Sequence, residues 1–249
     1  MDTGIFRHMD FDTRIAGFAD FVGRKKYLYD DNGHGTHVAG IIAGSGKGSN
    51  GKYRGIAPDT FLVSVKVLDK SGNGKIENVV EAAGWIIENK SAMNIRVVNI
   101  SFGTRAKMEN GPAIETGEDD YALIMAVEKM WDSGIVVVAA AGNNGPGNAS
   151  VTAPGISKKI ITVGAFDDKN FFSGRGPTRE CIVKPEVVVT GSNIIACNNH
   201  QGRYSSKSGT SMAAPVVSGA VARLIKNNPD ITPKAVSYTH LRAHETLSD

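Results

Sequence analysis

Short, nearly unbroken apolar runs recur along the chain, and they constrain its fold more than any other feature. Five of these runs predict strands, because each is four to eight residues long and rich in aliphatic side chains. They are Phe61–Leu68, Arg96–Ile100, Ile135–Ala141, Ile160–Phe166 and Val187–Val189. Strands that are apolar on both faces are typical of a parallel sheet that is covered on both sides.

Two stretches between these runs carry the apolar spacing of an amphipathic helix, namely Ile76–Asn89 and Tyr121–Trp131. The alternation of strands and helices predicts an α/β fold of three layers, with a mostly parallel central sheet and helices on both faces. Functional residues of such sheets gather at the carboxyl ends of the strands. We therefore expect a site near Ser101 and Gly142, which directly follow two of the predicted strands.

The size and charge of the chain exclude several classes of protein. Its 249 residues suit one sizeable domain. The formal net charge of +3 comes from 28 basic and 25 acidic residues that are mixed along the sequence. No cluster of like charges therefore indicates a surface that binds nucleic acid or a membrane. No apolar run approaches the roughly 20 residues of a membrane span. Two cysteines, Cys181 and Cys197, are too few for a disulfide framework, so we expect free thiols; one disulfide between them is the alternative.

Three segments place an aspartate, a histidine and a serine in chain order. They read MDTG at residues 1–4, NGHGTHVAG at 32–40 and SGTSMAAP at 208–215. A hydroxyl nucleophile at neutral pH needs an adjacent base and a carboxylate that orients the base, and Asp–His–Ser is one of the chain orders in which this triad occurs. Each residue alone also has an ordinary structural interpretation, such as a solvated acid, a packed histidine or a helix cap.

Taken together, these segments resemble the signature motifs of the subtilase family of serine proteases. Similar correspondences run from Asp2 to about Ala235, including GIAP at 55–58, AAGN at 140–143 and FSGRGP at 172–177. The resemblance implies a subtilisin-like fold of the bacterial type without a disulfide scaffold. It also implies a serine endopeptidase that cleaves peptide bonds through an acyl-enzyme intermediate.

The resemblance assigns catalytic roles to four residues. His34 matches the general base, Ser211 the nucleophile and Asp2 the carboxylate that orients the base. Asn143 matches the side-chain donor of the oxyanion hole. Ser211 is expected at the start of a helix, where free N–H groups and the helix dipole favour a developing negative charge.

The family's substrate-binding segments match small residues of this chain. The edge that pairs with substrate and the walls of the specificity pocket correspond to Ser101, Phe102, Gly103, Ala140, Ala141, Gly142 and Gly164. Small side chains there predict an apolar slot without a fixed charge. We therefore expect broad cleavage, with a mild preference for large uncharged residues before the scissile bond.

The resemblance implies no required cofactor, although many relatives bind structural calcium near the segment that corresponds to residues 46–52. This segment carries two lysines and no carboxylate, which argues against that calcium site and leaves calcium elsewhere open. A metal pair of His34 and His37 is the alternative on the helix face, but no HExxH motif or third ligand accompanies it. No metal ligands are therefore assigned.

The expected partners are protein or peptide substrates and the family's own propeptide, which this sequence does not include. Nucleic acid and membrane are not expected as partners. The compartment is left open between the bacterial cytoplasm and secretion. Physiological substrate and oligomeric state are not indicated by the sequence.

Both ends depart from the family pattern. Only Met1 precedes Asp2, where the family has a strand, so we expect a catalytic domain over residues 1–236 that lacks this strand and an Asp2 that frays. Residues 237–249 read SYTHLRAHETLSD, which has no apolar stripe, and they are interpreted as a non-native tail whose His240 and His244 are not ligands. A fragment truncated at both ends is expected to have weak or no activity.

Three alternative functions follow from the same residues. The first is a non-catalytic binding scaffold or inactive fragment with the subtilase fold, although all three triad residues are present. The second is a nucleotide-binding protein, suggested by Gly46-x₄-Gly51-Lys52, but Tyr53 stands where the phosphate-binding motif needs Ser or Thr. The third is an esterase, which would need a GxSxG motif at the nucleophile, and Ser211 lacks it.

Overall fold

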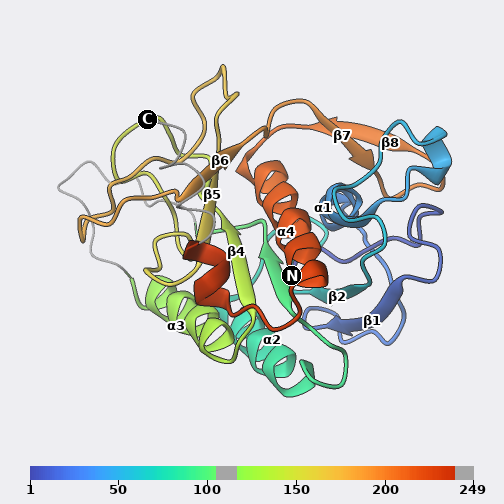
Figure 1. Ribbon diagram of the computed structural model, residues 1–249, viewed down its shortest axis with the longest axis horizontal. Coiled ribbons are helices and arrows are strands. Elements are labelled where there is room, and N and C mark those ends of the chain that lie inside the picture. Colours follow the sequence, from blue (N-terminus) through green and yellow to red (C-terminus); the bar gives the residue numbers. More distant parts are fainter. Residues whose placement is uncertain (105–116, 239–249) are drawn as a thin grey trace.

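The computed structural model describes residues 1–104 and 117–238. Beside a short 3₁₀ turn at Lys47–Ser49, its elements are β1 Ile15–Asp20, α1 His34–Ala43, β2 Leu62–Lys66, α2 Ile76–Asn89, β3 Val97–Ile100, α3 Glu118–Asp132, β4 Val136–Ala140, β5 Ile161–Ala165, β6 Val187–Val189, β7 Ile194–Cys197, β8 Tyr204–Lys207 and α4 Thr210–Asn227. Figure 1 shows β4 and β5 near the centre, with α2 and α3 to one side and α1 and α4 to the other, whereas β1, β7 and β8 lie towards the edge.

The sheet is parallel and is divided into two parts. Strands β3, β4, β5 and β6 pair in that order, and β1 pairs with β2, all in parallel. The antiparallel hairpin β7–β8 lies apart from them. Alternate residues of β4 bury into opposite layers: Val137 and Ala139 pack with α2 and α3, whereas Val136 and Val138 pack with α4. The predicted three-layer α/β architecture is confirmed.

The predicted elements match the observed ones closely, and the differences have physical causes. All five predicted strands are present, trimmed by up to three residues, and α2 has the predicted bounds. Helix α3 begins at Glu118 rather than Tyr121, because its first turn is acidic and favoured by the helix dipole rather than apolar. Strands β1, β7 and β8 were not predicted from the sequence. Gly17 and Asp20 interrupt the apolar run of β1, and β8 reads YSSK.

Residues 1–2 lie between the two parts of the sheet. The Asp2 N–H donates to the carbonyl of Val65, its carbonyl accepts the N–H of Val67, and the Met1 ammonium donates to the carbonyl of Asn99 at 3.0 Å. Beside them, β2, β3, α1 and α4 line a cavity of about 590 Å³. Asp2 is only 7% exposed. The expectation that Asp2 frays is therefore wrong.

The C-terminal region is described only in part. Residues 233–238 are helical, with Val236 buried. Residues 239–249, most of the predicted non-native tail, lie outside the described residues, as do His240 and His244. Both cysteines are free, with Cys181 exposed and Cys197 buried. Within the described part of the chain, no helix combines the length and hydropathy needed to cross a membrane.

Candidate active site

Asp2 and His34 are brought together although 31 residues separate them. His34 is the first residue of α1, and its Nδ1 lies 2.7 Å from Oδ1 of Asp2. Because a carboxylate only accepts, Nδ1 carries the proton and Nε2 is left as the basic nitrogen. The same Asp2 oxygen accepts the N–H of Thr3 at 2.7 Å. The pair thus has the tautomer that a general base requires.

Each member of this pair changes the titration of the other. Burial favours the neutral form of Asp2, but the charge and hydrogen bond of His34, joined by the N–H of Thr3, outweigh it and hold the pKa of Asp2 below its ordinary value of 3.8. Burial likewise lowers the pKa of His34, but the charge and hydrogen bond of Asp2 exceed that effect. The pKa of His34 is therefore raised above its ordinary 6.5.

Ser211 is the second residue of α4, and it is joined to Ser101 by two hydrogen bonds. Its hydroxyl donates to the Ser101 carbonyl at 2.8 Å, and the Ser101 hydroxyl donates to the Ser211 carbonyl at 3.0 Å. That carbonyl is free for Ser101 because the residue four positions on, Pro215, has no N–H to donate. Pro215, the sixth residue of α4, thus removes one helix hydrogen bond, which the Ser101 hydroxyl replaces.

The sequence predicted a continuous row of hydrogen bonds from Asp2 through His34 to Ser211. Among the described contacts the first bond is formed, whereas the Ser211 hydroxyl donates to Ser101 instead of the imidazole. Rotation about the Cα–Cβ bond of Ser211 changes the direction in which this hydroxyl points. Hydrogen bonds of this kind are often unformed before substrate binds.

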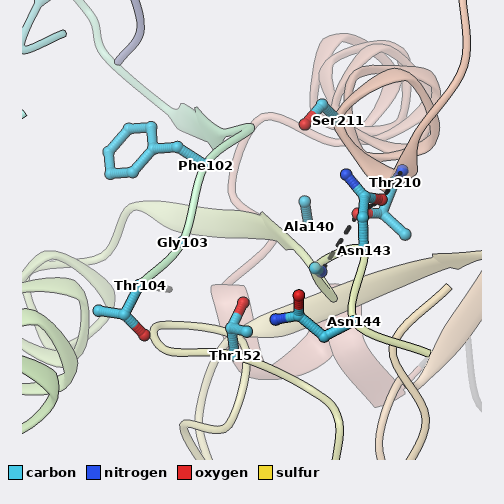
Figure 2. A pocket seen from close by; sticks show the side chains of 10 residues that line it. Phe102, Gly103, Thr104, Ala140, Asn143, Asn144, Thr152, Thr210 and Ser211 are labelled. Atoms are coloured by element: carbon cyan, nitrogen blue, oxygen red, sulfur yellow. Dashed lines mark hydrogen bonds between the residues drawn. The ribbon is translucent and has the colours of Figure 1, made fainter. Parts of the chain in front are cut away.

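Asn143 follows β4 and faces the start of α4. Its Oδ1 accepts both the N–H and the hydroxyl of Thr210, at 3.0 and 3.1 Å, and these two donors identify the oxygen of the amide. Figure 2 shows the remaining amide nitrogen on the side of Ser211. A donor is therefore held beside the Ser211 hydroxyl.

A cavity of about 390 Å³ opens next to Ser211 and Asn143 (Figure 2). It is lined by Phe102, Gly103, Thr104, Ala140, Gly142, Asn143, Asn144, Thr152, Thr210 and Ser211. None of these side chains is charged, as the sequence predicted. Hydroxyl and amide groups contribute much of the wall, however, so the prediction of an apolar slot is wrong in that respect.

The structure separates the predicted substrate-binding residues into two groups. Phe102, Gly103, Ala140 and Gly142 line the cavity, whereas Ser101, Ala141 and Gly164 are buried and do not line it. Gly164 packs against Pro185 and Ser173 instead.

Thr152 explains why two wall positions are glycine. Its Oγ1 would lie 2.5 Å from a Cβ at either Gly103 or Gly142, far below contact distance, and Gly142 also has φ +92°. Sequence reasoning missed Thr152, which lies nine residues after Asn143 and outside every motif that the sequence singled out.

His37 has a structural environment rather than a metal site. Its Nε2 lies 3.1 Å from the carbonyl of Ile194 and 2.9 Å from that of Ser205, so the ring ties α1 to the β7–β8 hairpin. Burial lowers the pKa of His37 to about 4, which keeps it neutral at physiological pH. The neighbouring His34 is engaged by Asp2.

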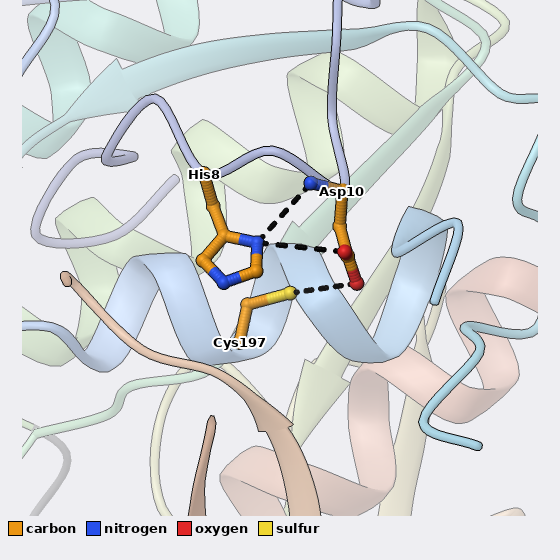
Figure 3. A group of neighbouring side chains, drawn as sticks. All are labelled: His8, Asp10 and Cys197. Atoms are coloured by element: carbon orange, nitrogen blue, oxygen red, sulfur yellow. Dashed lines mark hydrogen bonds and ion pairs between the residues drawn. The ribbon is translucent and has the colours of Figure 1, made fainter. Parts of the chain in front are cut away.

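His8, Asp10 and Cys197 form a buried group of metal-binding residue types (Figure 3). The Asp10 carboxylate already accepts the N–H groups of Gly46 and Gly48 at 3.1 and 2.9 Å. The Cys197 thiol also donates to it, and burial followed by the charge of Asp10 raises the pKa of that thiol far above its ordinary value. N–H and S–H donors point at this carboxylate, and a thiol is a poor ligand for calcium, so the group does not fit a calcium site.

Comparison with known proteins gives one consistent result. The model of the subtilase family matches residues 1–249. The chain is 41% identical to serine protease AprX of Bacillus subtilis over 263 aligned positions, which cover 95% of the chain and 58% of AprX. It is 35% identical to subtilisin DY of Bacillus licheniformis, over 95% of the chain and 78% of that protein.

Solved structures agree with these relatives. A cold-adapted subtilisin-like serine proteinase superposes with a TM-score of 0.77 at 33% identity, over 95% of this chain and 77% of that one. The structure named Sphericase gives a TM-score of 0.81 at 27% identity, over 96% of this chain and 79% of its own. The overall fold is thus shared with these proteins over more than three quarters of their length.

Proposed function

Because the chain belongs to the subtilase family, we propose that it is a serine endopeptidase that uses Asp2, His34 and Ser211. Residues 1–236 would form its catalytic domain. The observation that carries the proposal is the 2.7 Å bond between Asp2 and His34, together with a cavity that Ser211 and Asn143 line. Protein or peptide substrates follow from the family.

Attack on the substrate begins with a rotation of the Ser211 hydroxyl. The oxygen leaves the Ser101 carbonyl and turns to Nε2 of His34, which takes its proton as Oγ bonds to the carbonyl carbon of the peptide. The negative charge of Asp2 stabilises the imidazolium that forms. The raised pKa of His34 supports this role, since it makes the ring a stronger base.

The tetrahedral intermediate carries its negative charge on the former carbonyl oxygen. The Nδ2 group of Asn143 and the N–H groups at the start of α4 are the donors that we assign to this oxygen. His34 then gives its proton to the leaving amine, and the C–N bond breaks. Water repeats the sequence on the acyl-enzyme, which releases the acid and restores Ser211.

A fluorophosphonate probe tests this assignment on the chain as it exists. The reagent bonds covalently to a serine only where a base and oxyanion donors activate it. We expect a single adduct, mapped by mass spectrometry to the peptide that contains Ser211, and none after heat denaturation. A folded protein that gains no adduct would instead favour the non-catalytic binding scaffold.

Asn143→Ala is expected to lower kcat by about 10²–10³-fold with little change in KM, since the donor acts on the intermediate rather than on the bound substrate. This magnitude is the one known for the oxyanion-hole asparagine of subtilisin. Steady-state kinetics on a chromogenic peptide measure it. Asn144→Ala is the matched control, because Asn144 also lines the cavity and should change kcat less than threefold. Equal losses in both variants would contradict the assignment.

The cavity beside Ser211 is proposed to receive the residue before the scissile bond. It has room for a large side chain and its walls carry no charge, so Phe and Leu peptide anilides should be cleaved faster than Arg or Glu anilides. We expect kcat/KM to differ by about tenfold, roughly the effect of a modest change in pocket contacts.

Asn144→Asp tests the same cavity by adding a negative charge to its wall. A carboxylate on the wall should raise kcat/KM for the Arg anilide relative to the Glu anilide, by attraction to the cationic side chain. Strict preference of the unmodified protein for a charged anilide would refute the cavity assignment.

A further inference from the structure

Asp30 lies between the two segments that bring the acid and the base together. It is 6% exposed and belongs to the turn that precedes α1. Gly4 pairs with Asp30 as an isolated antiparallel bridge. The residue takes no part in the proton transfers proposed above, yet a buried carboxylate is stable only where donors surround it.

The two carboxylate oxygens of Asp30 bind different parts of the chain. Oδ1 accepts the hydroxyl of Thr3 at 2.9 Å and the N–H of Gly33 at 2.8 Å. Oδ2 accepts the N–H and the hydroxyl of Thr36 at 2.9 and 2.5 Å. One side chain therefore joins the acid segment, residues 2–4, to the first turn of α1.

Thr3 extends this connection to both members of the catalytic pair. Its hydroxyl accepts the N–H of Gly35, the residue after His34, at 2.9 Å. Its own N–H donates to Oδ1 of Asp2, the oxygen that also binds His34. The other oxygen, Oδ2, has no hydrogen-bond partner within the described residues. The direction of the Asp2 carboxylate therefore depends on where Thr3 is held.

We propose that Asp30 is a positioning residue which, through Thr3, keeps the Asp2 carboxylate aligned with Nδ1 of His34. The inference rests on the proposed function. Misplacement of a reacting group by about 1 Å can cost roughly 100-fold in rate, so a buried link between acid and base has a direct catalytic consequence.

The titration of His34 reports on this alignment without any substrate. Burial has the largest influence on the pKa of His34 and lowers it, the charges of Asp2 and Asp30 raise it, and Lys207 at the end of β8 lowers it. His37 faces it from the same helix. If the Asp2 carboxylate turns away from the ring, the pKa of His34 must fall.

Two threonine variants distinguish a role in positioning the Asp2 carboxylate from a role in stabilising helix α1. Thr3→Val removes the hydroxyl that donates to Asp30 and accepts from Gly35. Thr36→Val removes a hydroxyl that donates to the same carboxylate and accepts from the N–H of Phe6. Both side chains are buried, and each substitution deletes two hydrogen bonds with little change in volume. Only the first touches the acid segment.

The experiment measures kcat/KM on a peptide anilide and the pKa of His34 by NMR of the imidazole. Thr3→Val should lower kcat/KM by about tenfold or more and lower the pKa of His34, and Thr3→Ser should restore both. Thr36→Val should leave both near the unmodified values at a similar loss of melting temperature. Equal effects of the two valine variants, or no effect of Thr3→Val, would overturn the proposal.

The two readouts also separate this inference from the proposed function. If the unmodified protein hydrolyses nothing, the proposed function fails, but the NMR comparison of the variants still decides whether Thr3 and Asp30 align the pair. If the protein is active and the pKa of His34 is the same in all variants, the positioning role fails alone.

Discussion

Ser211→Ala is expected to lower kcat for peptide hydrolysis by about 10⁶-fold, the size of effect known for loss of the nucleophile in subtilisin. The reason is that the hydroxyl of Ser211 forms the bond to the substrate, and no neighbouring group replaces it. The activity that remains should reflect only transition-state binding by Asn143 and the start of α4. Active-site-titrated kinetics on a peptide anilide measure the change.

Ser208→Ala is the matched control for this substitution. Ser208 precedes the same helix, and its hydroxyl accepts the N–H of Asn193 in an exposed turn. We expect its kcat to stay within about twofold, since this hydroxyl is remote from the reacting bond. Both variants should keep the melting temperature of the unmodified protein within a few degrees. Hydrolysis by Ser211→Ala at more than a thousandth of the original rate, in protein free of contaminating protease, would reject Ser211 as the nucleophile.

Asp2→Asn is expected to lower kcat by about 10⁴-fold, because an amide can present its N–H₂ group to Nδ1 and hold His34 in the wrong tautomer. The pH dependence should change as well. The base must be neutral to accept a proton, so kcat/KM of the unmodified protein should rise with pH through a pKa above the ordinary 6.5 of histidine. Without the charge of Asp2, burial dominates, and this acid limb should move to lower pH.

Profiles of kcat/KM between pH 5 and pH 10 measure this shift. Asp12→Asn is the control, since it removes the same charge from an exposed pair with Lys47 far from the site. Its acid limb should coincide with that of the unmodified protein. An acid limb that stays in place in Asp2→Asn would show that another group controls the ionisation.

The sheet was predictable from sequence because its strands are buried on both faces. Burial of every residue from Val136 to Ala140 requires an unbroken apolar run, which is also what the sequence displays. The hairpin of β7 and β8 was not predictable in this way. Its Tyr204–Lys207 strand is half-exposed, and its polar residues do not distinguish a strand from a loop.

The candidate catalytic residues were named as a set from the sequence because each lies in a motif of small residues, and their catalytic roles stay a prediction. The environment that orients them was not. Thr152 shapes the cavity and Asp30 links the acid to the base, but both make their contacts across long separations in sequence. The fraying expected of Asp2 also failed for this reason: hydrogen bonds to Val65 and Val67 compensate for its position near the chain end.

The starts of two helices have a mechanical consequence for the site. His34 begins α1 and Ser211 is the second residue of α4, and the two helices pack through one cluster of apolar side chains. Dispersion contacts are individually weak, about 0.1–0.2 kcal/mol per atom pair, and yield gradually to displacement. Side-chain packing therefore sets the distance from Nε2 of His34 to the Ser211 oxygen, whereas backbone hydrogen bonds to Val65 and Val67 hold Asp2.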